Sequence, residues 1–188
     1  NDALATQPDW QPVDTGLTSN AIGSIVVDPS DPSGNTLYAG TGEPNGSSDS
    51  EAGVGLFRST DGGAHWALLP GSAAVARDRS ISAISIDPAD PQTIWIGTAM
   101  ARHGSSSVNG GRRTPPNAPP LGVYRSTDGG TFFSLRLNVP GDSANPAGGA
   151  DFFRGGVTKR VRDPNHPQQL YASVTGYGVF RAGNPLDG

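Results

Sequence analysis

The sequence predicts an all-β fold made of β-propeller blades, in which each blade is a four-stranded antiparallel meander. An eight-residue turn occurs twice, as residues 59–66 (STDGGAHW) and residues 126–133 (STDGGTFF). The same order of short apolar strands surrounds both turns, and an Asp-Pro pair follows the first strand of each unit. Proline removes a ladder donor and ends strand pairing at that point. Because a meander cannot bury both faces by itself, units of this period are expected to stack.

The first predicted blade covers residues 22–70. Its strands are short, apolar or alternating, and bounded by Gly, Pro, Asn and Asp, which is typical of antiparallel β structure. The predicted strands are residues 22–28, 36–41, 55–58 and 66–69. The first copy of the repeated turn joins the third strand to the fourth.

The second predicted blade covers residues 71–140 and repeats this order, with a long loop at residues 99–121. Its strands are expected at residues 81–87, 93–98, 122–125 and 133–137. A third, truncated blade at residues 141–188 reaches its third strand and stops before its turn. No segment requires a helix.

Residues 1–21 are interpreted as the end of a preceding blade and a linker, because the segment from Trp10 to Val13 resembles residues 66–69. The repeat from Asp61 to Asp128 is long enough that 188 residues hold about three blades, which is an incomplete ring. Closed propellers have about four to eight blades. We therefore expect the remaining blades to come from the same parent chain or from other chains.

The composition narrows the classes of partner and site. Charged residues make up 16% of the chain and the net charge is -4, so no general basic field is available to hold nucleic acid. The absence of cysteine excludes disulfides, thiolate metal sites and a cysteine nucleophile. No apolar run has the length of a membrane span. The sequence predicts no nucleic-acid partner and no membrane span.

The repeated turn resembles the Asp box, or bacterial neuraminidase repeat, whose pattern is Ser-x-Asp-x-Gly-x-Thr-Trp. Both copies match its Ser, Asp and Gly, while His65 and Phe132 replace the threonine and the second copy ends in phenylalanine. The matching positions are Ser59, Asp61, Gly63 and Trp66 in the first copy and Ser126, Asp128, Gly130 and Phe133 in the second. Nearly the whole chain resembles the superfamily of WD-repeat-like, Asp-box propellers.

This resemblance implies several kinds of protein: sialidases, xyloglucan-cleaving endoglucanases, sortilin-type receptors, photosystem assembly factors and secreted bacterial proteins. It also implies that the turn lies away from the active face and has a structural role. Short polar side chains in turns usually serve the turn itself, and an aromatic residue can pack between blades. An extracytoplasmic location in a bacterium follows from the same resemblance.

A candidate binding surface lies at the end of the blades opposite the repeated turns, where the long loops are expected to gather. The candidate binding residues are Arg77, Arg79, Arg102, His103, Arg112, Arg113 and Arg154. Arginine clusters suit carboxylate or sulfate groups, so an acidic glycan or an acidic patch on a protein is the expected partner. A local salt-bridged loop and a flexible arm remain alternative interpretations of these residues.

The carboxylates of this surface leave two further interpretations open. Glu43, Asp49 and Glu51 have hard oxygen ligands that suit calcium, although a solvated hairpin tip explains the same residues. A glycosidase needs two carboxyl groups facing each other across the scissile bond. The sequence contains no Arg-Ile-Pro motif of a sialidase, and Trp10, Trp66 and Trp95 occupy apparent strand positions where packing is the simpler use.

The sequence therefore favours a non-catalytic recognition or scaffolding module that binds a protein or glycan through its long-loop face. No catalytic residue, cofactor or metal is assigned. One alternative is part of a sialidase-like or xyloglucanase-like glycoside hydrolase, with some catalytic carboxylates outside this chain. A second alternative is a subunit of a larger surface or photosynthetic assembly.

Overall fold

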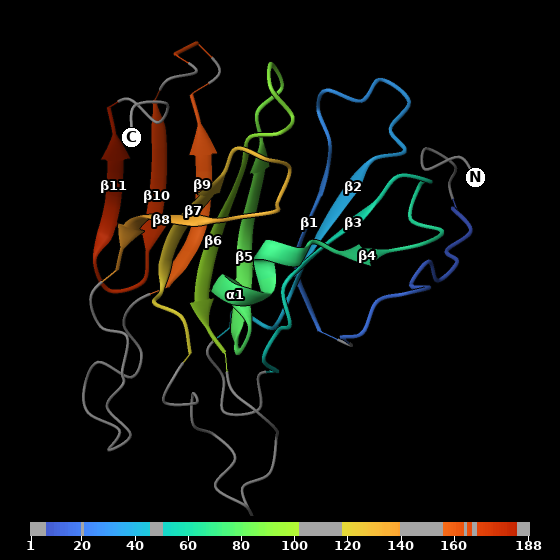
Figure 1. Cartoon of the computed structure of the whole chain (residues 1–188), viewed down its shortest axis with the longest axis horizontal. Coiled ribbons are helices and arrows are strands. Elements are labelled where there is room, and N and C mark those ends of the chain that lie inside the picture. The colour runs from blue at the N-terminus through green and yellow to red at the C-terminus, as the bar shows by residue number, and fades with distance from the viewer. Residues whose placement is uncertain are drawn as a thin grey trace, which may run out of the picture.

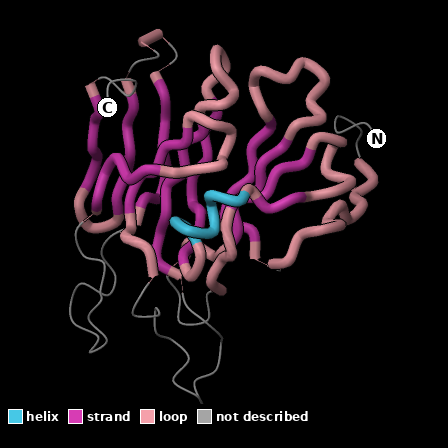
Figure 2. The backbone as a smooth tube through the Cα atoms, viewed as in Figure 1, coloured by secondary structure: helices cyan, strands magenta, loops and turns pink. Residues whose placement is uncertain are grey.

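The computed structural model describes residues 7–19, 21–45, 51–101, 118–139, 156–163, 165–166 and 169–183. It confirms the predicted all-β fold: the chain forms three antiparallel sheets that stand side by side (Figures 1 and 2). Each sheet is a meander in which strands that follow one another in the sequence are hydrogen-bonded neighbours. No helix within these residues is long and apolar enough to cross a membrane.

The first sheet has four strands in the order β1-β2-β3-β4. They are β1 (Ile22–Val27), β2 (Leu37–Thr41), β3 (Leu56–Ser59) and β4 (Ala67–Leu68). The second sheet repeats this order with longer strands, which are β5 (Arg79–Ile86), β6 (Ile94–Met100), β7 (Gly122–Ser126) and β8 (Ser134–Asn138).

The third sheet has three strands within the described residues. They are β9 (Val157–Arg162), β10 (Leu170–Val174) and β11 (Gly178–Ala182). The register of β10 with its two neighbours matches that of the middle strands in the other sheets. Tyr171 lies opposite Val161 and Arg181, just as Trp95 lies opposite Ser85 and Arg125. Positions in the three sheets can therefore be compared residue by residue.

Alternation along the strands gives each sheet two different faces. One buried cluster joins Tyr38 and Leu56 of the first sheet to Ile96 and Tyr124 of the second. A second cluster joins residues on the opposite face of the second sheet, such as Trp95, to residues of the third sheet, such as Ala172. The second sheet is thus covered on both faces by these two cores. A third, smaller cluster of Ala39, Phe57 and Trp66 belongs to the first sheet, and Leu17 packs against it.

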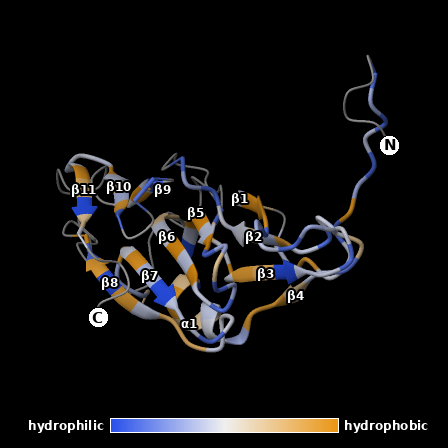
Figure 3. Cartoon of the chain, turned by 90° about the horizontal axis from the view of Figure 1, so that it is seen from above, coloured by the Kyte–Doolittle hydropathy of each residue, from blue (hydrophilic) through white to orange (hydrophobic). Residues whose placement is uncertain are grey.

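The first strands of the three sheets lie next to one another along one side, as the view from above shows (Figure 3). Ser24 Oγ of β1 donates to Ile81 O of β5 at 2.7 Å, and Ser82 of β5 donates to Val157 O of β9. Glycine allows this close approach. A Cβ atom added at Gly97 would lie 2.6 Å from the Val157 side chain.

The first repeated turn is closed by its own polar side chains. The Gly63 N–H donates to Ser59 Oγ at 2.9 Å, and the His65 N–H donates to Asp61 Oδ1 at 2.9 Å. Hydrogen bonds from the His65 backbone and side chain and from Ser59 lower the pKa of Asp61 to about 2. Gly62 and Gly63 have φ angles of 72° and 93°, a region that glycine enters without steric cost.

The second turn uses the same bonds. The Gly130 N–H donates to Ser126 Oγ at 2.8 Å, and the Phe132 N–H donates to Asp128 Oδ1 at 3.0 Å. The last aromatic residue of each turn is buried, with Trp66 7% exposed and Phe133 3% exposed. In both turns the polar side chains serve the backbone, and the aromatic ring packs into a core.

Each turn also contacts a segment that precedes its own sheet. Trp66 Nε1 donates to Val13 O at 2.8 Å, and the Trp66 N–H donates to Thr15 O at 2.9 Å. In the second turn the side chain of Leu69 lies against Gly130, and the Gly71 N–H donates to Gly130 O at 3.0 Å. The segment that precedes each of these two sheets therefore covers the turn of that sheet.

Two expectations are wrong. A short 3-10 helix, η1 (Pro70–Ser72), and one turn of α-helix, α1 (Ala73–Ala76), precede the second sheet. Proline at the start and an Ala-Ala-Val-Ala run favour helix there. Trp10 is not in a strand and is 87% exposed, because no described strand lies beside it to pair with.

Candidate functional site

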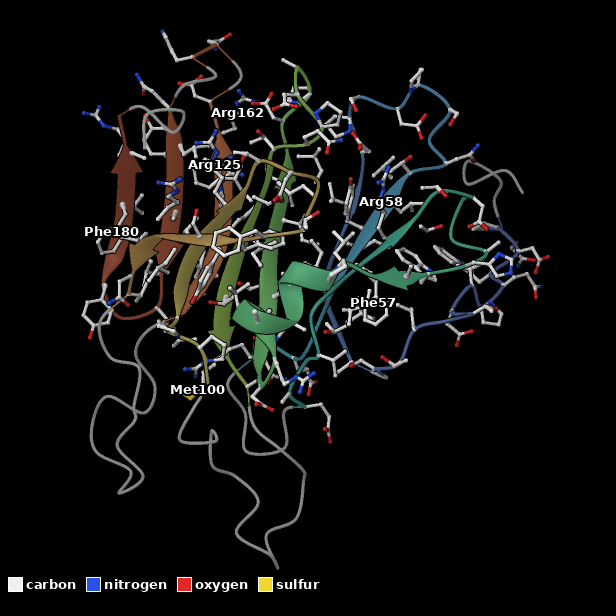
Figure 4. The ribbon with its side chains drawn as sticks, viewed as in Figure 1. Phe57, Arg58, Met100, Arg125, Arg162 and Phe180 are labelled. Atoms are coloured by element: carbon white, nitrogen blue, oxygen red, sulfur yellow. The ribbon has the colours of Figure 1, made fainter. Side chains whose placement is uncertain are left out.

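The predicted binding surface lies at the end of the sheets where Met100 is labelled in Figure 4. Backbone hydrogen bonds tie its described segments together. The Gly53 N–H donates to Arg79 O at 2.7 Å, and the Asp78 N–H donates to Gly53 O at 3.1 Å. Arg79 Nε donates to Pro119 O at 2.7 Å. Three segments that are far apart in the sequence therefore form one continuous surface, which we call the long-loop face.

A shallow pocket of about 300 Å³ lies on the long-loop face. It is lined by Ala73, Ala74, Arg77, Asp78 and Pro119. Arg77 is exposed and Asp78 is half-buried, with a φ angle of 64°. Aspartate is one of the few residues other than glycine that enters this region with some frequency. The unusual backbone places one cation and one carboxylate at the same small pocket.

The predicted binding residues differ in whether they are exposed, buried or outside the described residues. Arg77 is exposed on the long-loop face, as expected. Arg79 is not in a loop: it is the first residue of β5, is 1% exposed, and holds Pro119 in place from inside. The remaining candidates lie outside the described residues, and they are Arg102, His103, Arg112, Arg113 and Arg154.

Within the described residues, the carboxylates of the long-loop face do not form the pair beside aromatic side chains that a glycosidase site would need. The Glu51 N–H donates to Glu43 Oε2 at 3.2 Å, and Asn45 Nδ2 donates to Glu43 Oε1 at 3.2 Å. Glu43 thus stabilises its own loop, while Asp49 lies outside the described residues. Within the described ranges, no group of three or more His, Asp or Glu side chains has the spacing of a metal site.

A second candidate site, which is absent from the residues predicted above, lies between the second and third sheets. It is a cavity of about 330 Å³ with aromatic and cationic residues in its wall. Trp95 of β6 and Arg160 of β9 face each other there, with Arg160 Cζ 4.8 Å from the centroid of the indole ring. Arg125 Cζ lies 5.4 Å from the same centroid. Cations at this range are attracted by the negative face of the ring.

Arg160 is the most unusual residue of this cavity. It is 7% exposed, and its Nε and Nη1 atoms have no hydrogen-bond partner within the described residues. Burial, and to a lesser degree the charge of Arg162, lowers the pKa of Arg160 to about 9, although Asp87 opposes this shift. The guanidinium is still charged at neutral pH.

Arg162, two residues farther along β9, has a partner of its own. Its Nη1 atom lies 2.7 Å from Asp87 Oδ1. Burial tends to raise the pKa of Asp87, but hydrogen bonds from Arg162 and the Ala89 N–H outweigh it and lower that pKa. Asp87 is thereby paired with Arg162. Among the described residues, no carboxylate is hydrogen-bonded to Nε or Nη1 of Arg160.

The internal repeat shows that Arg160 replaces an apolar residue. Ser85 lies opposite Trp95 in the second sheet, and Val161 lies opposite Tyr171 in the third. Ile84 and Arg160 each precede these residues by one place, so they hold corresponding positions. Ile84 packs against the core between the first and second sheets, while Arg160 borders a cavity. A residue-by-residue alignment of the first strands is the sequence signal that could have found this site.

The strand arrangement is similar to part of a larger propeller. An ancestral GH74 enzyme is 20% identical with a TM-score of 0.57, over 90% of this chain and 18% of that chain. The GH74 xyloglucanase from Xanthomonas campestris is 22% identical with a TM-score of 0.49, over 81% and 20% of the two chains. The GH74 enzyme from Niastella koreensis is 17% identical with a TM-score of 0.40, over 93% and 31%.

This chain therefore spans less than a third of the length of each of these structures. The likeness to the ancestral enzyme shows a shared β-propeller fold and nothing about chemistry, because the identity is low. No family model matches the chain, and no curated protein matches it.

Proposed function

We propose that this chain is a non-catalytic recognition module of a β-propeller, and that it binds an acidic glycan or an acidic protein surface through the long-loop face. The observation that carries this proposal is the pocket beside Arg77 and Asp78, which three joined segments hold in place. An exposed guanidinium on a rigid base suits a carboxylate or sulfate group.

The repeated turns support placing the chain with the Asp-box propellers, since the Ser and Asp side chains of both turns bond their own backbone. From that likeness we also propose an extracytoplasmic location in a bacterium. The remaining blades, from the same parent protein or from other chains, would be its neighbours. Detection of the parent protein in the periplasmic or secreted fraction would support this location, whereas its confinement to the cytoplasm would contradict it.

The binding proposal is tested on an array of glycans that carry sialic acid, uronic acid or sulfate, with neutral glycans beside them. We expect binding to the acidic members and a loss of about tenfold in affinity for Arg77→Ala, equivalent to roughly 1.4 kcal/mol. Lys159→Ala is the matched control, because Lys159 is an exposed cation on β9. Equal affinity of the two variants would contradict the proposal.

A glycoside hydrolase part is the alternative that the GH74 likeness keeps open. It requires two carboxyl groups about 5 to 9.5 Å apart with substrate between them. Asp78 is the one carboxylate at the described pocket, and no aromatic side chain lines that pocket. Release of reducing sugar from xyloglucan by the purified chain, abolished in Asp78→Asn, would favour the hydrolase over the binding module.

A further inference from the structure

The cavity between the second and third sheets has the chemistry of a ligand site. Phe180 of β11, which is labelled in Figure 4, is part of the cavity wall. The cavity wall joins residues from both sheets, including Trp95 and Phe180 as flat apolar surfaces and Arg160 as a buried cation. The site is thus built by the contact of two sheets and not by a single loop.

Arg160 needs an acceptor that the described residues do not supply. Its Nε and Nη1 atoms are buried and have no hydrogen-bond partner in the described part of the chain, and the residue is 7% exposed. A buried N–H left without an acceptor costs free energy, more so when the group is charged. The stacking contact with Trp95 orients the guanidinium but offers it no oxygen.

The other charges of the cavity wall have the same sign. Arg136 of β8 and Arg181 of β11 line the cavity and are exposed. Asp87, the nearby carboxylate, is bound to Arg162 and is not part of the wall. A ligand with a negative group would therefore be attracted by these arginines, and none of the residues lining the cavity is a carboxylate that would repel it.

The packed core between the first two sheets provides an internal comparison. There the corresponding position is Ile84, which packs against a buried cluster that includes Phe133. Replacement of an isoleucine by a buried, unpartnered arginine destabilises a core that serves packing alone. The difference between the two sheet contacts thus indicates that the second has a use other than packing.

We propose that this cavity binds a small organic anion. A carboxylate of the ligand accepts hydrogen bonds from the Arg160 guanidinium, and a flat apolar body lies against Trp95 and Phe180. Arg136 and Arg181 attract the anion to the entrance. This site is separate from the long-loop face and does not depend on its function.

The test uses benzoate as the probe, with neutral benzamide as its isosteric control, and isothermal titration calorimetry on the whole chain. We expect saturable 1:1 binding of benzoate and at least tenfold weaker binding of benzamide. Arg160→Ile, which copies Ile84 of the second sheet, should lose benzoate binding by tenfold or more. Arg77→Ala on the long-loop face should bind benzoate as the native chain does.

Three results would overturn the proposal. The first is equal binding of benzoate and benzamide, and the second is unchanged benzoate binding in Arg160→Ile. The third is that benzoate does not bind; binding of a peptide with the sequence of residues 126–139 would then identify the cavity as a site for a turn and strand of polypeptide. Arg160→Lys is a second variant that keeps the charge, and it should retain a measurable preference for benzoate over benzamide.

Discussion

Replacing Arg160 by isoleucine should make the unliganded protein more stable. Two buried N–H groups of Arg160 have no partner within the described residues, and leaving such a group unsatisfied costs about 1–3 kcal/mol. The substitution also removes the contact with Trp95, in which Arg160 Cζ lies 4.8 Å from the ring centroid, and a cation over a ring contributes about 0.5–2 kcal/mol. The expected net gain in the free energy of unfolding is about 1–4 kcal/mol, as found when apolar residues replace buried ions.

The measurement is urea unfolding at pH 7 in a buffer without organic anions, followed by circular dichroism. The midpoint should rise while the slope against urea stays unchanged, because a change of slope would signal a different unfolding reaction. Ile84→Arg is the matched control in the second sheet, and it should destabilise the protein by about 2 kcal/mol or more, since it places a charge at a partly buried position against an apolar core. A loss of stability in Arg160→Ile of 1 kcal/mol or more would refute the reasoning.

Three further predictions concern the sheet contacts and the turns. Gly97→Ala should lower the free energy of unfolding by about 1–3 kcal/mol through overpacking, and Val157→Ala in the same chain should restore part of it, as a double-mutant cycle would show. Phe133→Ala should cost about 3–5 kcal/mol in urea unfolding, whereas the neighbouring Phe132→Ala, at a side chain 67% exposed, should stay within about 0.5 kcal/mol; equal effects would contradict the assignment of the buried ring. The folded pKa of Asp61, about 2, lies below its usual 3.8, so its stabilising contribution is complete above about pH 4 and is lost as the pH falls through 2. The stability difference between the native chain and Asp61→Asn should therefore shrink over that pH window, and a constant difference would show that the carboxylate charge is not involved.

The repeated turns made the strand order predictable from the sequence. Their glycines and their Ser and Asp side chains determine the local backbone, and this local chemistry does not depend on distant residues. The short helix before β5 was not predictable from the strand pattern, because it occupies a connection between two sheets.

The candidate sites were less accessible to sequence reasoning. Arg79 is charged, as surface residues usually are. It is buried because it is the first residue of β5 and donates a hydrogen bond to Pro119 O. Arg160 likewise has the appearance of a surface cation in a strand of mixed polarity. Its burial results from the packing of one sheet on another, a long-range contact that a pattern along one strand does not encode.

The contact of each turn with the preceding repeat affects how such proteins can be rearranged. Val13 lies against Gly63 and Leu69 lies against Gly130, so the residues that cover a turn come from the segment before its sheet. A gene duplication or an engineered insertion that copies one sheet, from β1 to β4, would separate a turn from its cover. A copy that starts near residue 13 and stops near residue 69 would contain both the turn and the segment that covers it. The segment that can be copied as a unit therefore begins about one strand before the first strand of the sheet.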